Sequence, residues 1–346
     1  MAEEKLEKTL KDIAKELNVS VSTISRVVNN KSYVSPKTRK MVLEGLAKYN
    51  YVPNQVARSL KKRSTETVGI VIPDISENFF AQIIKGIDEI LGRKKYSIIL
   101  ADSNESSKKE EHYLRLLYQN RIDALVLATV SKDYTALNMY FGNNIPVVFI
   151  DNIPDLDHDI DCVIINNQKA SIIAVNHLIE NGNRDIAIIV GSPNETTGYE
   201  RLEGYKRALE HHNIPVNENL IKFGNYKEDT GYSCMKELLE NRSNNPFTGI
   251  YIGSEKMTYG AIKAIKEHNL SIPEDIALVG FDVHDKSGLI TPGITTIRQP
   301  ENDIGKIVAD LIIKRLKEKQ KDGEAAPIRQ RIILEPILEI KKSSIR

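Results

Sequence analysis

The sequence has little of what would build a disulfide-rich, metal-binding or membrane-spanning protein. It contains two cysteines, Cys162 and Cys234, with no CxxC spacing and no histidine cluster near either. Isolated cysteines are typical of reduced thiols in a cytoplasmic protein and argue against a disulfide framework or a metal site. No stretch approaches about eighteen apolar residues. The charged start, residues 1–8, does not resemble a signal peptide, so we expect a cytoplasmic protein without a membrane segment.

Catalytic motifs are missing as well. The sequence holds no GxxxxGK[ST], GxSxG or HExxH, and it offers no pairing of a nucleophile with a base. We therefore expect no catalytic residues, no cofactor and no enzyme activity.

Charge is distributed unevenly along the chain. Residues 1–63 carry 14 Lys and Arg against 6 Asp and Glu, whereas the remainder carries 34 against 41. Residues 1–63, the basic head, therefore have a net charge of +8 and the remainder has −7, although the whole chain has only +1. Such a basic head predicts a polyanionic partner for this part of the chain alone.

Residues 9–29, TLKDIAKELNVSVSTISRVVN, predict two helices separated by a turn. Thr9 followed by Asp12 is a helix-start pattern, and Ser20 can cap the second helix after a break at residues 18–20. At about 100° per residue, one side of the second helix is apolar and the other is polar. The apolar side holds Ile24, Val27 and Val28, and the polar side holds Ser22, Ser25, Arg26 and Asn29.

An apolar face behind short hydroxyl groups and one arginine predicts a helix-turn-helix whose second helix lies in a major groove. Arg26 can fork onto guanine, and Asn29 can reach a base edge or a phosphate. The alternative is an ordinary surface helix with a polar face.

A third helix is expected from Ser35-Pro36, with Val42, Leu46 and Tyr49 completing a three-helix core before Pro53. Residues 53–63 read as a short helix and a basic linker, too short to be stable alone. We thus divide the chain into a helix-turn-helix headpiece at 1–52, a hinge helix and linker at 53–64, and a core at 65–346.

The core alternates short apolar runs with amphipathic segments, which predicts an α/β fold of two similar lobes with parallel sheets. Ligands in such folds bind at the carboxyl ends of strands, here in the cleft between the lobes. We expect lobe 1 at about 65–164 and 297–327, and lobe 2 at about 165–296 and 328–346. The expected strands are 68–72, 97–101, 124–128, 147–150, 186–190, 221–224, 249–253 and 276–281, with a closing strand region at 328–340 that returns the chain through both lobes. The expected helices include 82–91, 108–120, 168–180, 201–211, 257–268 and 303–319.

Several motifs together resemble the lactose-repressor (LacI/GalR) family of bacterial transcription regulators. They are residues 9–29, YVSPKTR from Tyr33, YVPNQVARSL, GIVIPDISENFF from Gly69, RLEGYKRAL, IPEDIALVGFD and TTIRQP. The resemblance covers nearly the whole chain. It implies a cytoplasmic homodimer that binds a pseudo-palindromic DNA operator and represses carbohydrate-utilisation genes. It also implies a periplasmic-binding-protein-like core that senses a small-molecule effector, usually a sugar.

The resemblance assigns DNA contacts to positions in the first 60 residues. Val21, Ser22 and Arg26 match base-reading positions, and Leu60 matches a residue wedged into the minor groove. Further DNA-contacting positions are Thr9, Leu10, Ser20, Thr23, Ser25, Asn29, Tyr33, Ser35, Asn54 and Ala57.

The resemblance also assigns a ligand site. Its residues are Phe79, Phe80, Asp151, Arg201, Tyr226, Ser254, Asp282 and Gln299. An aromatic face suits the C–H side of a sugar ring, and Arg and Asp suit paired hydroxyls. The family's usual Asn-Asp is Ser254-Glu255 here, and its second Asp after Asp282 is Val283, so the identity of the ligand stays open.

Other roles are open for these residues. Phe79 or Phe80 could be plain core, Arg201 could be a salt-bridged residue at a helix start, and Asp151 and Asp282 could cap turns.

Two other classes of function compete with the regulator, and one alternative lies within the regulator class. A periplasmic sugar-binding protein is disfavoured by the basic head and the missing signal peptide. A sugar-converting α/β enzyme is disfavoured by the absent catalytic motifs. Within the regulator class, the alternative is a corepressor-dependent protein that responds to a purine or to a partner protein.

Overall fold

The computed structural model describes residues 9–28, 34–49, 51, 64–132, 134–156, 159–285, 288–319 and 328–345. The chain separates into two compact units, residues 1–65 and 66–346. Residues 53–63, expected to form a hinge helix and linker, lie outside the described residues. No helix in the described ranges is long and apolar enough to cross a membrane.

The N-terminal unit contains the three expected helices, α1 (Leu10–Glu16), α2 (Val21–Val28) and α3 (Pro36–Lys48). Thr9 and Asp12 cap the start of α1 reciprocally: Asp12 N donates to Thr9 Oγ1 (3.4 Å) and Thr9 N donates to Asp12 Oδ2 (3.0 Å). Asn18, with φ of 52°, turns the chain between α1 and α2. The starts predicted from capping residues are therefore confirmed.

One small apolar core joins the three helices. Its buried members come from both sides of the turn and from α3: Ile13, Ala14, Ile24, Val27, Val42 and Leu46. Because α2 turns its apolar side toward α1 and α3, its other side is left facing solvent. The predicted three-helix core is thus confirmed.

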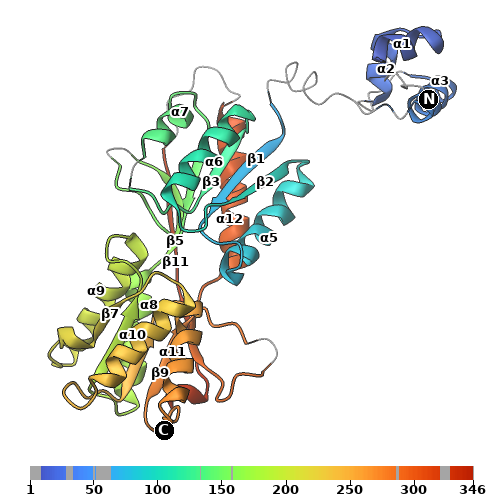
Figure 1. The fold of residues 1–346 in the computed structure, drawn as a ribbon. Coiled ribbons are helices and arrows are strands. Elements are labelled where there is room, and N and C mark those ends of the chain that lie inside the picture. Colours follow the sequence, from blue (N-terminus) through green and yellow to red (C-terminus); the bar gives the residue numbers. More distant parts are fainter. Residues whose placement is uncertain are drawn as a thin grey trace, which may run out of the picture. The chain divides into compact units, whose positions relative to one another are not determined.

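The second unit consists of two lobes, each built on a six-stranded sheet (Figure 1). In spatial order, the first sheet holds β11 (Arg331–Leu334), β5 (Asp161–Ile165), β4 (Val147–Ile150), β3 (Ala124–Leu127), β1 (Thr67–Ile72) and β2 (Ser97–Asp102). The second holds β12 (Ile337–Glu339), β10 (Thr295–Arg298), β9 (Ala277–Phe281), β8 (Gly249–Ile252), β6 (Ile186–Val190) and β7 (Ile221–Phe223). All neighbouring strands are parallel except β12, which is antiparallel to β10.

Helices cover both faces of each sheet. In lobe 1, α5 (Asn78–Arg93) and α12 (Glu301–Lys319) pack on one face, and α6 (Ser107–Gln119) and α7 (Asn138–Phe141) pack on the other. In lobe 2, α8 (Asn167–Glu180) and α9 (Thr196–His211) lie opposite α10 (Glu228–Glu240) and α11 (Glu255–Glu267). Short 3-10 turns lie at Thr135–Leu137, Glu218–Leu220 and Lys342–Ser344.

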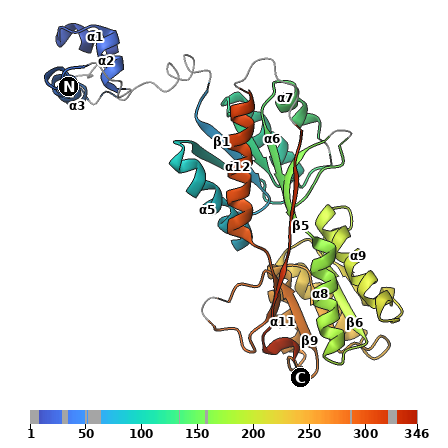
Figure 2. The same ribbon diagram turned by 180° about the vertical axis from the view of Figure 1, so that it is seen from behind.

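Helices α5 and α12 run side by side in both ribbon views (Figure 2). They approach closely where Gly86 meets Gly305. A Cβ on Gly86 would lie 2.3 Å from Asn302 O, and one on Gly305 would lie 2.1 Å from Ile83 O. This contact explains how the C-terminal helix returns to lobe 1 after the chain has built lobe 2.

The expected lobe boundaries need one correction. Residues 328–346 were placed in lobe 2, but β11 pairs in parallel with β5 in the first sheet. Its start is held there by Asp161, whose carboxylate accepts bonds from Arg315 (2.6 and 2.8 Å), Arg329 (3.0 Å) and Gln330 N (2.9 Å). The last crossing between the lobes therefore lies at the β11–β12 connection, after residue 334, and not at residue 328.

Candidate functional site

The solvent-facing side of α2 is a candidate DNA-reading surface. Val21 is 39% exposed, Ser22 and Arg26 are also exposed, and Ile24 and Val27 are buried beneath them. This matches the division of faces expected from helical spacing. An exposed arginine beside a short side chain can approach a base edge without steric hindrance from its neighbours.

Hydroxyl groups organise the start of this helix. Ser20 Oγ accepts from Thr23 N at 3.0 Å, so Ser20 is the N-terminal cap of α2 as predicted. The same oxygen lies 2.7 Å from Ser22 Oγ and 2.8 Å from Thr23 Oγ1. Ser35 caps α3 by accepting from Thr38 N at 3.1 Å. These groups lie at helix N-termini, where N–H groups and hydroxyls favour phosphate oxygens.

The remaining residues assigned to DNA contact fall into two groups, those that the structure describes and those outside the described residues. Thr9 caps α1, Leu10 packs partly against the headpiece core, and Ser25 lies half-buried on α2. Asn29, Tyr33, Asn54, Ala57 and Leu60 lie outside the described residues.

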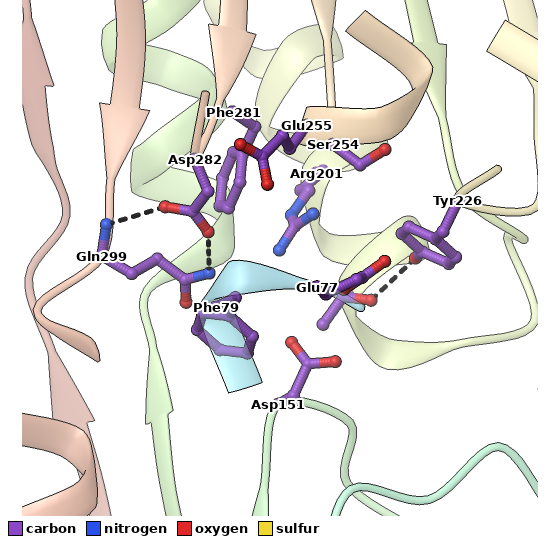
Figure 3. Close-up of a pocket in the computed structure, with 11 residues that line it drawn as sticks. Glu77, Phe79, Asp151, Arg201, Tyr226, Ser254, Glu255, Phe281, Asp282 and Gln299 are labelled. Atoms are coloured by element: carbon purple, nitrogen blue, oxygen red, sulfur yellow. Dashed lines mark hydrogen bonds between the residues drawn. The ribbon is translucent and has the colours of Figure 1, made fainter. Parts of the chain in front are cut away.

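A second candidate site is a small pocket between the two lobes of the core (Figure 3). Its residues come from the carboxyl ends of strands and the amino ends of helices in both lobes. They are Glu77, Phe79, Asp151, Thr197, Arg201, Tyr226, Ser254, Glu255, Phe281, Asp282 and Gln299. The free space among them is about 50 Å³, room for only a few water molecules. A sugar could enter only if the lobes separated or side chains moved.

The pocket brings together all but one of the ligand-site residues assigned from the sequence. The exception is Phe80, which is 2% exposed and packs in the lobe 1 core against Phe79. Phe79 itself reaches the pocket wall.

Arg201, near the start of α9, is held from three sides. Its Nε donates to Asn167 Oδ1 (2.9 Å), and its Nη1 donates to Gly253 O (2.6 Å). The guanidinium lies 3.7 Å above the centre of the Phe281 ring. The side chain is 4% exposed, so these contacts compensate for the removal of its charge from water.

Asp282 lies directly after β9 with φ of 52°, and two bonds fix its carboxylate. Its oxygens accept from Gln299 N (3.1 Å) and Gln299 Nε2 (2.5 Å). Burial raises the pKa of Asp282 to about 7, while the bonds from Gln299 oppose that rise. Asp282 therefore exchanges its proton close to neutral pH.

Tyr226 forms the far wall of the pocket from a left-handed backbone position with φ of 64°. Its hydroxyl lies 2.9 Å from Thr197 Oγ1. Its ring covers Gly191 so closely that a Cβ there would lie 2.0 Å from the ring. Gly191 is therefore needed for this tyrosine to reach the pocket.

Hydrogen bonds join the lobes around the pocket. Lys256 at the start of α11 donates to Asp74 Oδ2 (2.5 Å) and to Ser76 Oγ (2.6 Å) in lobe 1. Thr197 Oγ1 and N donate to Asn152 Oδ1 (3.0 and 3.2 Å). These bonds hold the lobes closed and would have to break if the lobes opened.

Four pocket residues were not expected from the sequence: Glu77, Thr197, Glu255 and Phe281. Three of them had a local signal. Glu77 directly precedes the Asn-Phe-Phe of the GIVIPDISENFF motif, and Glu255 follows Ser254 where the family pattern departs. Phe281 directly precedes Asp282 in the IPEDIALVGFD motif. Thr197, in the first turn of α9, had no such signal.

Two family models match successive ranges of this chain. Residues 9–54 match the family described as bacterial regulatory proteins, lacI family. Residues 65–335 match periplasmic binding proteins and the sugar binding domain of the LacI family.

Whole-length relatives are similar too. Catabolite control protein A of Priestia megaterium is 34% identical over 94% of this chain and 97% of its own length. The HTH-type transcriptional repressor PurR of Histophilus somni is 32% identical over the same shares. A structure of the transcriptional regulator CelR in complex with cellobiose is 28% identical, with a TM-score of 0.72 over 97% of this chain and 99% of that one. The chain belongs to the LacI family of bacterial regulatory proteins.

Proposed function

We propose that this protein is a transcriptional repressor of carbohydrate-utilisation genes, controlled by a sugar or sugar derivative bound between its lobes. The observation that carries the proposal is the combination of two sites in one chain. The exposed face of α2 offers Ser22 and Arg26 to DNA, and the core offers a small polar pocket. Family membership over both regions supports the same reading.

A homodimer suits the DNA-reading surface. A single short recognition helix reads only a few base pairs, and helix-turn-helix proteins gain specificity by binding two half-sites about one helical turn apart. A dimer of this chain would accordingly bind a pseudo-palindromic operator.

The pocket suits a sugar because aromatic and polar groups alternate around it. Phe79 and Tyr226 offer rings, while Arg201, Asp282 and Gln299 offer bonded polar groups. Closure around a polyhydroxylated ligand would add its bonds to those that already join the lobes, such as Lys256 to Asp74. A ligand changes operator affinity only if it binds the two lobe arrangements unequally.

The segment from residue 53 to 64 is the proposed connection between ligand and operator. Two copies in a dimer would pack in the minor groove, with Leu60 wedged between base pairs at a cost of a few kcal/mol of unstacking. Ala57 would lie in the same contact. Leu60→Ser should weaken operator binding and reduce DNA bending while leaving ligand affinity of the free protein unchanged. Wild-type bending in that variant would reduce this segment to a passive tether.

The experiment that tests the proposal starts from an operator selected out of random duplex DNA by the purified protein. Fluorescence anisotropy then measures operator affinity with and without each member of a sugar and sugar-derivative panel. At least one sugar should change the affinity by about 5–150-fold. Purine bases in a parallel series test the corepressor alternative. A purine that raises affinity, with no response to any sugar, would establish that alternative.

A further inference from the structure

We propose that the pocket selects a sugar bearing a protonated amine and rejects phosphorylated sugars. This inference rests on the proposed function, because it names the chemical class of the effector at the same site. It starts from the charges that line the pocket, which are four carboxylates and one guanidinium. Glu77 and Asp151 belong to lobe 1, Glu255 and Asp282 belong to lobe 2, and Arg201 is the cation.

The two lobe 2 carboxylates already have partners. Asp282 accepts two bonds from Gln299, at 3.1 and 2.5 Å. Glu255 Oε1 accepts from Tyr259 (2.8 Å) and from His284 N (2.9 Å). The His284 ring, whose side chain is 6% exposed, also lies 3.5 Å from Glu255. These two acids are therefore part of the wall.

The two carboxylates of lobe 1, Glu77 and Asp151, differ from those of lobe 2 in their bonding. Neither the Glu77 nor the Asp151 side chain makes a hydrogen bond to any residue that the structure describes. Glu77 directly precedes α5 yet does not cap it, and Asp151 leaves β4 in a left-handed conformation with φ of 61°. Figure 3 shows both around the middle of the pocket, beneath Arg201. Both side chains are half-buried, so their unbonded oxygens can take up a proton or accept a hydrogen bond from a ligand in the pocket.

The electrostatics of this pair agree with the geometry. Burial and the nearby Asp151 carboxylate raise the pKa of Glu77 to about 8. Burial also raises the pKa of Asp151, and Arg201 opposes that rise only in part. Glu105 and Glu195 lie behind them and repel the same charge. An ammonium group between Glu77 and Asp151 would relieve this repulsion, whereas a phosphate would add to it.

Arg201 is the one cation among the residues that line the pocket, against four carboxylates. Its Nε and Nη1 already donate to Asn167 Oδ1 and Gly253 O, and its guanidinium lies over the ring of Phe281. Lys256, at the lobe margin, is bonded to Asp74 and Ser76. Lys227 lines a neighbouring pocket together with Glu228 and Asp229. An anionic ligand would therefore meet four carboxylates and one partly engaged guanidinium, and would lose its hydration for little gain.

The test compares matched sugars by isothermal titration calorimetry at neutral pH. Each set contains the amino sugar, the parent sugar and its 6-phosphate, in the glucose, galactose and mannose series. In the series that binds, we expect the amino sugar to bind at least about tenfold more tightly than the parent, and the phosphate to bind more weakly than either. A phosphate that binds more tightly than its parent would overturn the charge inference while leaving the sugar-controlled repressor intact.

Two variants make the result specific. Glu77→Gln should remove the preference for the amine, because it removes one of the two unbonded carboxylates. Asp88→Asn makes the same change of charge at an exposed position on α5 and should leave the ranking unchanged. An unaltered ranking in Glu77→Gln would show that the amine is held elsewhere and would reject the proposed pair.

A ligand-free measurement decides the case in which no panel member binds. That outcome counts against the proposed sugar function, but the repulsion between Glu77 and Asp151 can still be measured. Glu77→Gln should raise the melting temperature of the full chain at pH above about 8, where Glu77 ionises, whereas Asp88→Asn should not. An unchanged melting temperature in Glu77→Gln would overturn the inference.

Discussion

The face of α2 and the pocket between the lobes use polar groups in opposite environments. Ser22 and Arg26 are exposed on a three-helix unit whose core is only a handful of aliphatic side chains. Arg201 and Asp282 are 4% and 5% exposed, and each is bonded on several sides. Exposed groups keep their charge whatever the partner, whereas buried groups change charge or partner at considerable cost. Operator binding should therefore respond mainly to salt, and effector binding mainly to pH and to loss of single side chains.

The largest effect is expected where a buried charge is removed. Arg201→Ala should abolish the effector response and destabilise the core by about 1–3 kcal/mol for each buried acceptor left unsatisfied, because Asn167 Oδ1 and Gly253 O lose their donor. Thermal unfolding and an effector titration measure the two consequences. Arg207→Ala, at an exposed position on the same helix, is the control and should change neither. A normal effector response in the Arg201 variant would show that the pocket is not the effector site.

The next effect is a fall in core stability as pH rises. Burial and Glu301 raise the pKa of Asp282 to about 7, from an ordinary 3.8, while the bonds from Gln299 and the charge of Arg201 oppose the shift. The folded protein therefore keeps a proton that the unfolded chain releases, and its stability declines between about pH 4 and 7. The decline continues to about pH 8 through Glu77, whose pKa is raised to about 8.

Melting temperatures across this pH range test the prediction. Asp282→Asn should flatten the curve between about pH 4 and 7. Asp310→Asn, at an exposed position on α12, should leave the shape of the curve as it is. If the melting temperature of the wild type did not change over this pH range, the proposed difference between buried and exposed charged groups would be wrong.

A moderate effect is expected on the DNA side. Arg26→Ala should cost about 1–3 kcal/mol on the operator and less on random DNA, because a base contact is lost. Lys40→Ala removes an exposed cation of α3. If it weakens DNA binding, it should do so by similar amounts on the operator and on random DNA. For the wild type, the logarithm of the binding constant should fall with that of salt, with a slope of about −0.9 per neutralised phosphate. Equal losses for Arg26→Ala on both DNAs would make Arg26 a phosphate contact.

The smallest effect is expected from the cap of α2. Ser20→Ala should destabilise the headpiece by about 1 kcal/mol, because Thr23 N loses its acceptor. Ser22→Ala should cost less stability, because its hydroxyl is bonded to another exposed hydroxyl, Ser20 Oγ (2.7 Å). It should cost more operator specificity, because Ser22 is at a position that we propose reads a base. Headpiece unfolding and operator titrations separate the two. Equal stability losses would mean that Ser22 is also a structural hydroxyl.

Sequence periodicity predicted the headpiece and most of the core well. Capping residues set the starts of α1, α2 and α3, and strands such as β4 and β6 were predicted to the residue because they are uniformly apolar and buried. Two strands and one longer helix were not predicted from the sequence. β5 begins with a buried Asp161, β10 is half threonine, and α10 has few apolar residues. In each case the polar residues are satisfied by tertiary partners, such as Arg315 for Asp161, that no local pattern reveals.

The sequence predicted most residues of the pocket, but not the hydrogen bonds and charge states of those residues. Family motifs supplied Arg201, Asp282 and Gln299, yet the bonds that join Asp282 to Gln299 span 17 residues and form only when β9 and β10 pair. The close approach of Glu77 to Asp151 depends on two different loops of lobe 1 and on burial by lobe 2. Such burial sets the charge of a pocket, and sequence spacing alone does not encode it.

The chain passes between the lobes three times, after β5, between β10 and α12, and between β11 and β12. We expect three connections between the same two lobes to act as a hinge that favours one rotation of the lobes over sliding or twisting. A bound molecule would then act on the core mainly by changing the angle between the lobes. Effectors of different shape would differ in how far they turn that angle and not in the direction of the motion.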